Sequence, residues 1–237
     1  MQTINEILAG NAYPGRGIIL GRSEDNGRAV AVYFIMGRSE NSRNRIFTKT
    51  EDGIKTEAFD ASKLTDPSLV IYHPVRQFGD ALIVTNGDQT DTICEHLTSG
   101  KKFHGAMMSR VFEPDPPIFT PRISGILRGN GAVTLAIVKN IGGDAEVPAH
   151  QFFEYSQPQA GKGHLIHTYS GAARPDGSLE SFVGEPRAVK INVADGLETY
   201  ANEVWNALDA ANRVALYARE IVVATGEYRE IIINKYK

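Results

Sequence analysis

The chain has 237 residues, with 25 Lys and Arg against 28 Asp and Glu, and a formal net charge of −3. This nearly balanced charge is untypical of a dedicated nucleic-acid or anionic-membrane binder, so we expect neither partner. The single cysteine, Cys94, excludes an intrachain disulfide and hence a secreted disulfide-rich scaffold.

The length predicts one domain over residues 1–237. The first residues lack the basic and apolar pattern of a signal peptide. No apolar run approaches the roughly 20 residues that a transmembrane helix needs. We therefore expect a soluble, cytoplasmic protein.

The first elements in chain order are a short helix and a hairpin. Ile4, Ile7 and Leu8 at helical spacing predict an N-terminal amphipathic helix that ends at Gly10-Asn11. Apolar runs at about 17–22 and 29–36 flank Asn26-Gly27, a strong signal for a hairpin of two antiparallel strands. Because both runs are continuously apolar, we expect a sheet that is buried on both faces.

The rest of the chain is predicted to be rich in strands, with fewer helices. Segments rich in Val, Ile and Thr predict strands at 69–72, 81–85, 125–127, 132–138, 164–169, 188–193 and 228–233. Helices are predicted at 90–97, 103–112 and 197–222; the last has a long apolar stripe at spacings of three and four. Residues 171–186 predict a surface loop. Together these elements predict an α+β fold of mostly antiparallel strands in packed layers.

The densest group of polar side chains directly follows the predicted strand 29–36. It contains Arg38, Ser39, Arg43, Asn44 and Arg45. The planar guanidinium group pairs with two phosphate oxygens at once, and Arg16, at the turn before the neighbouring strand, is placed to join the same edge. The loop therefore predicts an anion site, with a solvated polar loop as the alternative.

A second polar group follows the predicted strand 81–85. It contains Asn86, Gly87, Thr90 and Asp91, whose amide and carboxylate groups suit a heterocycle or a ribose. The same residue types are also typical of a turn followed by a helix cap. Both interpretations stay open for this segment.

Three further residues are candidates for chemistry. Glu113 lies between Phe112 and Pro114, where desolvation would raise its pKa toward a value useful for proton transfer. Arg122 leads into a predicted strand and suits a phosphate, and Tyr72 lies at the end of another. The alternatives are that Glu113 caps a turn and that Tyr72 packs in the core.

Several cofactor and nucleophile motifs are missing from the sequence. There is no phosphate-binding P-loop, no nucleophile elbow and no correctly spaced dinucleotide fingerprint. His164 and His167 are three apart in a predicted strand and would face opposite sides, so we expect no metal site. The start Met1-Gln2 offers no Ser, Thr or Cys as an N-terminal nucleophile.

The order of these motifs resembles the archaeal-type inosine monophosphate (IMP) cyclohydrolases, most strongly over residues 13–125. The resemblance is carried by Tyr13, Gly15 and Arg16, by Arg38, Ser39, Asn44 and Arg45, by Asn86, Gly87, Thr90 and Asp91, and by Thr120 to Ile123 with Gly125. It implies a four-layer αββα sandwich like that of the N-terminal-nucleophile hydrolases, without their nucleophile.

The resemblance also implies a reaction, the last step of de novo purine synthesis. Formamidoimidazole carboxamide ribonucleotide closes its ring to IMP and loses water, with a nucleotide monophosphate as the small-molecule partner and no cofactor. It implies catalytic roles for Arg38, Tyr72 and Glu113. The implied substrate-binding residues are Arg16, Ser39, Arg43, Asn44, Arg45, Asn86, Gly87, Thr90, Asp91 and Arg122. A purine-nucleotide-binding module without turnover and an amide hydrolase of the same fold are the alternatives, and self-association into a homo-oligomer stays open.

Overall fold

The computed structural model describes residues 1–64, 66–141, 144–171 and 173–236, and it contains two antiparallel β-sheets. In spatial order, sheet A consists of β11 (Arg187–Lys190), β10 (Lys162–His167), β1 (Arg16–Arg22), β2 (Arg28–Met36), β12 (Arg213–Val222) and β13 (Tyr228–Asn234). Sheet B consists of β3 (Arg45–Lys49), β4 (Gly53–Ala58), β5 (Val75–Phe78), β6 (Ala81–Thr85), β7 (Arg122–Leu127), β8 (Val133–Ile141) and β9 (Asp144–Tyr155). This confirms the predicted α+β class with antiparallel strands.

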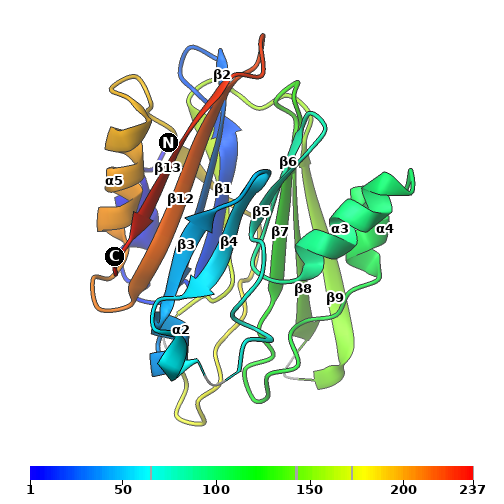
Figure 1. The fold of residues 1–237 in the computed structure, drawn as a ribbon, viewed down its shortest axis with the longest axis vertical. Helices are drawn as coiled ribbons and strands as arrows, with labels where there is room; N and C mark the ends of the chain where they lie inside the picture. The colour runs from blue at the N-terminus through cyan, green and yellow to red at the C-terminus, as the bar shows by residue number, and fades with distance from the viewer. Residues whose placement is uncertain (65, 142–143, 172, 237) are drawn as a thin grey trace.

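Helices cover the outer faces of both sheets (Figure 1). The helices are α1 (Ile4–Leu8), α2 (Glu40–Arg43), the 3₁₀ turn η1 (Ala61–Lys63), α3 (Gln89–Thr98), α4 (Phe103–Met108) and α5 (Leu197–Ala207). α1 and α5 pack on sheet A, whereas α3 and α4 pack on sheet B. The layers therefore follow the order helix, sheet, sheet, helix.

The sheets face each other across a continuous apolar core. Side chains such as Ile18 and Tyr33 of sheet A share one buried cluster with Val84 and Ile123 of sheet B. The opposite face of β2 contributes Val32 to a second cluster, beneath α1 and α5. β1 and β2 are thus buried on both faces, which explains why their sequences are continuously apolar rather than alternating.

The clearest predicted helix is wrong over its second half. α5 ends at Ala207, and β12 then runs through the middle of sheet A, between β2 and β13. A turn separates the two elements, where the backbone N–H groups of Asn212 and Arg213 donate to the Asp209 carbonyl. Because β12 is largely buried on both faces, its residues lack the alternation that marks a strand, and helical spacing matched them by coincidence.

Other predicted boundaries also differ from the structure. Residues 68–70 form a turn, so the strand predicted at 69–72 is wrong and β5 begins only at Val75. α4 ends at Met108, short of the predicted residue 112, and β3, β4 and β9 were not predicted. Residues 171–186, apart from residue 172, form a loop whose Ser181 makes an isolated bridge to Tyr169. Within the described ranges, no helix has the length and apolar character to cross a membrane.

Candidate functional site

Buried polar side chains gather at the end of the sandwich where β1, β3 and β7 begin and β2 and β10 end. We call this group the polar cluster; its members are Tyr13, Arg16, Tyr33, Arg45, Tyr72, Glu113 and Tyr169. They come from both sheets and from the loops between strands. Each lies close enough to others of the group for their charges to interact.

Arg16 begins β1 and is 9% exposed. Its buried Nε has no hydrogen-bond partner among the described residues. Burial opposes the charge on Arg16, yet neighbouring acidic side chains hold its pKa well above the ordinary value: Tyr169, Glu113, Tyr72 and Tyr13. The group therefore stays a cation, with donors left free for an anionic or carbonyl oxygen.

Arg45 begins β3 and is fully buried. Its Nε donates to the Ser42 carbonyl at 2.8 Å, and its Nη2 donates to the Met36 carbonyl at 3.1 Å. Its Nη1 is buried without a partner among the described residues. Burial lowers the pKa of Arg45, and the nearby charge of Arg16 lowers it further. Two backbone contacts thus hold a second guanidinium beside the first, again with a free donor.

Glu113 is the buried carboxyl group of the polar cluster, with 2% of its surface exposed. Burial is the largest effect and raises its pKa to about 7, although Arg16 and Arg122 act to lower it. No ion pair joins Glu113 to Arg16 within the described part of the chain. A carboxyl group with a pKa near neutrality suits both the removal and the delivery of a proton.

Tyr72 lies in the loop before β5 rather than at the end of a strand. Thr56 fixes this loop, because Thr56 N–H donates to the Tyr72 carbonyl and Tyr72 N–H donates to Thr56 Oγ1. The hydroxyl of Tyr72 shares a hydrogen bond of 2.9 Å with that of Tyr33. Tyr72, a predicted catalytic residue, therefore does reach the polar cluster. It is held there by a loop, which the strand pattern of the sequence did not indicate.

An aromatic stack connects Arg38 to the polar cluster. The guanidinium carbon of Arg38 lies 5.1 Å from the centre of the Tyr13 ring. Tyr13 in turn stacks on Tyr169, with ring centres 5.8 Å apart. Arg38 is half-buried, unlike Arg16 and Arg45, and so lies at the edge of the group. Sequence analysis missed Tyr169 as a functional candidate, because a tyrosine after a strand carries no motif.

Gly87 and Arg122 adjoin Glu113 from the side of sheet B. A Cβ at Gly87 would lie 2.8 Å from Arg122 Nη1 and 3.3 Å from Glu113 Oε1. Arg122 is engaged by the protein itself: its Nη1 donates to Asp88 Oδ1 at 2.7 Å and to Gln89 Oε1 at 2.8 Å. The structure thus brings Gly87 to Glu113, where only a glycine leaves room for the guanidinium.

The remaining predicted binding residues of the Arg38–Arg45 segment make contacts that shape that segment. Ser39 caps α2 by accepting from Ser42 N–H. Arg43 Nη2 donates to Asn212 Oδ1 at 3.0 Å, and Asn44 exchanges two hydrogen bonds with the backbone of Asp60. Their contacts with a substrate stay predictions.

The predicted residues after β6 also make internal contacts. Asn86 is buried and bonds the backbone of Pro121 and Ile123. Thr90 Oγ1 lies 2.6 Å from Thr85 Oγ1. Asp91 pairs with Arg76 at 3.0 Å on an exposed part of the surface. These contacts favour the turn-and-cap interpretation, and any substrate contact of these residues also stays a prediction.

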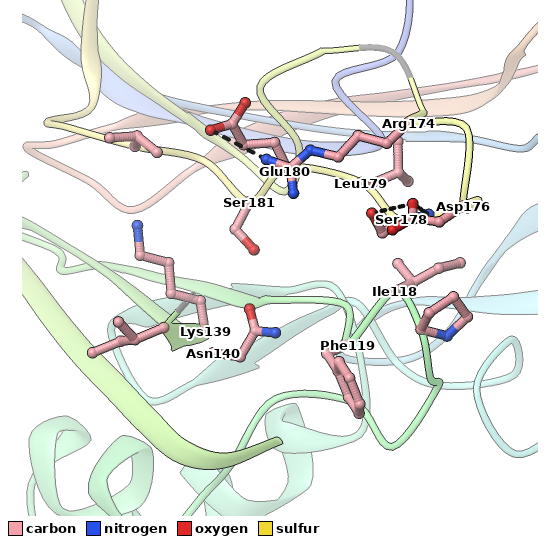
Figure 2. A pocket seen from close by; sticks show the side chains of 13 residues that line it. Ile118, Phe119, Lys139, Asn140, Arg174, Asp176, Ser178, Leu179, Glu180 and Ser181 are labelled. Carbon is pink, nitrogen blue, oxygen red and sulfur yellow. Dashed lines mark hydrogen bonds and ion pairs between the residues drawn. The ribbon is translucent and has the colours of Figure 1, made fainter. Parts of the chain in front are cut away.

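A cavity of about 570 Å³ lies between two segments of the chain outside the polar cluster (Figure 2). One wall is formed by residues 117–119 and 139–141, and the other by residues of the 174–183 loop. Two of its charged side chains already have partners in the protein. Arg174 pairs with Glu180 at 3.8 Å, and Lys139 donates to the Phe182 carbonyl at 2.5 Å. None of the predicted site residues lines this cavity. Among the described residues, no group of three His, Cys, Asp or Glu side chains is arranged to hold a metal ion.

Comparisons with known proteins agree on one family. A family model described as IMP cyclohydrolase-like protein matches residues 13–226. The IMP cyclohydrolase of Methanopyrus kandleri is 33% identical over 160 residues, which cover 66% of this chain and 75% of that protein. The IMP cyclohydrolase of Methanococcus aeolicus is 24% identical over 146 residues, covering 60% and 71%. That of Halobacterium salinarum is 31% identical over 131 residues, covering 54% and 63%.

Proposed function

The chain belongs to the family of IMP cyclohydrolase-like proteins, and we propose that it closes the purine ring of IMP. The substrate is formamidoimidazole carboxamide ribonucleotide. Its carboxamide nitrogen attacks the neighbouring formyl carbon. One proton leaves this nitrogen and a second leaves the formamido nitrogen, and both depart with the formyl oxygen as water.

The observation that carries this proposal is the unpaired state of the charged groups in the polar cluster. Arg16 and Arg45 each have a buried donor without a partner among the described residues, and Glu113 is buried with a pKa of about 7. Leaving buried donors unsatisfied costs about 1–3 kcal/mol each, which is recovered when a ligand supplies acceptors. The arrangement fits a reaction that develops negative charge on an oxygen and moves protons.

The burial of each group suggests its role. Glu113 takes the proton from the attacking nitrogen and delivers it to the departing oxygen. Of the guanidinium groups, Arg16 acts most strongly on the charge of Glu113, so we assign to Arg16 the stabilisation of the developing oxyanion, with Arg45 beside it. Tyr72 donates to the same oxygen.

Arg38, which is half-buried above Tyr13, suits the monophosphate at the edge of the site. The sequence predicted a catalytic role for Arg38 and substrate-binding roles for Arg16 and Arg45. This assignment exchanges those roles, because Arg16 and Arg45 are buried beside Glu113 whereas Arg38 is half-buried at the edge of the site.

The fold supports three further parts of the proposal. Two antiparallel sheets with helices outside fit the sandwich of the N-terminal-nucleophile hydrolases, although ring closure needs no covalent nucleophile. Sheet A takes strands from both halves of the chain, which supports one domain over residues 1–237. A biosynthetic reaction on a nucleotide monophosphate supports a cytoplasmic location.

Turnover of the proposed substrate tests the function. Purified protein is mixed with formamidoimidazole carboxamide ribonucleotide, and IMP formation is followed by ultraviolet absorbance. We expect IMP to form with the wild type and its rate to fall about 100-fold to 10,000-fold with Glu113→Gln. The matched control is Glu220→Gln, because Glu220 is also buried but pairs with Arg28 at the other end of sheet A.

The two alternative functions give different results in the same assay. A nucleotide-binding module would bind IMP and form none. An amide hydrolase would release formate from the substrate, and the six-membered ring of the purine would not form. Either result contradicts the proposed function.

A further inference from the structure

The ring of Tyr169 is held tightly between two segments of the chain. Tyr13 stacks on one face, with an angle of 14° between the rings. At Gly15, whose φ is +78°, a Cβ would lie 2.5 Å from the Tyr169 ring and 2.2 Å from Thr168 Oγ1. The glycine of the Tyr13–Arg16 motif therefore allows the backbone to approach the Tyr169 ring and the adjoining Thr168 side chain. This close approach fixes where the Tyr169 hydroxyl points.

A chain of hydrogen bonds sets the direction of that hydroxyl. Asp115 accepts from Thr120 N–H at 2.6 Å and from Thr120 Oγ1 at 2.5 Å. Thr120 Oγ1 is the donor to Asp115 Oδ2, so Thr120 gives its single hydroxyl hydrogen to Asp115. Thr120 Oγ1 also lies 2.7 Å from the Tyr169 hydroxyl, and it must therefore accept from Tyr169. The Tyr169 oxygen is left with lone pairs and no hydrogen for any other partner.

Thr120 also links Tyr169 to Glu113, because the Glu113 N–H donates to the Thr120 carbonyl at 2.9 Å. Tyr169 is 2% exposed, and it lies near enough to Arg16 and Glu113 for their charges to shift its pKa. Burial raises the pKa of Tyr169 well above its ordinary value, so the phenol stays neutral. The polar cluster thus contains two acceptors: a carboxylate that binds protons near neutrality, and a neutral oxygen that does not.

The attacking nitrogen needs two such acceptors, and here the inference rests on the proposed function. The carboxamide nitrogen carries two hydrogens, of which one leaves during ring closure and the other remains on N1 of IMP. We propose that Tyr169 contacts the substrate by accepting the hydrogen that remains, while Glu113 takes the one that leaves. Thr120 and Asp115 are positioning residues that act through Tyr169.

The proposal predicts a preference among purine monophosphates. IMP presents N1–H to the Tyr169 oxygen, whereas adenosine monophosphate presents a lone pair at N1 that repels it. Tyr169→Phe removes the oxygen alone. We expect this variant to bind IMP about 5- to 10-fold more weakly, the usual effect of losing one hydrogen bond. The ratio of IMP to adenosine monophosphate affinity should fall by about tenfold or more, because the repulsion is lost as well.

The experiment measures both affinities by calorimetry, together with kcat, KM and Tm. Thr120→Val breaks the hydrogen-bond chain, and Thr120→Ser keeps its hydroxyl. We expect the valine variant to lose discrimination between the two nucleotides and the serine variant to restore it. The matched control is Tyr200→Phe, because Tyr200 is also fully buried but its hydroxyl has no partner among the described residues. This control should change neither affinity.

Each outcome decides the proposal. If Tyr169→Phe, or Thr120→Val where the first variant does not fold, keeps the affinity ratio within twofold of wild type, the role of Tyr169 is wrong. Wild-type turnover under the same conditions would leave the proposed function intact in that case. A wild type that neither binds IMP nor forms it overturns both.

Discussion

Glu113→Gln should separate the activity of this protein from its stability. A buried carboxyl group whose pKa rises from 4.5 to about 7 is harder to ionise in the folded state than in the unfolded state. Between these pH values the native state binds more protons, so the free energy of unfolding of the wild type falls as pH rises. Glutamine does not ionise in this pH range, so the stability of the variant lacks this contribution to its pH dependence.

The structure gives the size of the effect. A rise in pKa from 4.5 to about 7 corresponds to about 3 kcal/mol at any pH above the folded-state value. Solvent screens this effect little, because Glu113 is 2% exposed. Relative to wild type, the variant should therefore gain about 3 kcal/mol of stability between pH 4.5 and pH 8 while its turnover falls at least 100-fold.

Urea unfolding of both proteins at a series of pH values measures this difference. Subtracting one free energy of unfolding from the other removes the contribution of groups that both proteins share. The same samples give the pH profile of kcat/KM, which should rise through about pH 7 in the wild type, since the ionised carboxylate accepts the first proton. A stability difference that does not change with pH, or a variant with wild-type turnover, would refute the assignment of Glu113.

Two further predictions concern residues around Tyr169. Gly15→Ala should lower Tm by at least several degrees and abolish IMP binding, because its Cβ would overlap Thr168 and the Tyr169 ring at a φ of +78°. Thermal unfolding measures the Tm, and calorimetry measures IMP binding. An unchanged Tm would contradict the close packing at Gly15. His167 is buried, and burial lowers its pKa from 6.5 to about 4, so it stabilises the fold above pH 6.5 and this contribution is lost as pH falls toward 4. His167→Asn, whose amide can replace Nδ1 in its contact with the Tyr169 carbonyl, should reduce this acid-induced loss by about 3 kcal/mol in urea unfolding; an equally steep loss in the variant would show that His167 does not cause it.

The strands that could be predicted from the sequence are those separated by a clear turn signal. The hairpin of β1 and β2 was predicted because Asn26-Gly27 separates two apolar runs, and Asn26 does adopt a positive φ of 58°. β12 was missed because a strand buried on both faces has no alternation, and its apolar residues extended the stripe of α5. Only the tertiary setting, between β2 and β13, distinguishes the two states.

The candidate site was predictable where local chemistry signals it. Glu113 between an aromatic residue and a proline indicated a desolvated carboxyl group, and the structure confirms that this side chain is buried. Arg43 and Arg45 looked equivalent in sequence, yet one contacts Asn212 and the other is fully buried in the polar cluster. Tyr169 lies 56 residues after Glu113 by sequence position, and only the stacking of the two sheets brings them together. The spacing of residues along the sequence does not indicate which distant residues meet in the fold.

A crystal structure of the protein with IMP bound tests the central claim most directly. The account predicts that the N1 and C2 edge of the purine lies within hydrogen-bond distance of Glu113 and Tyr169, with Arg16 beside C2. IMP bound in the cavity between residues 117–119 and the 174–183 loop, or with its C2 edge facing solvent, would contradict the account.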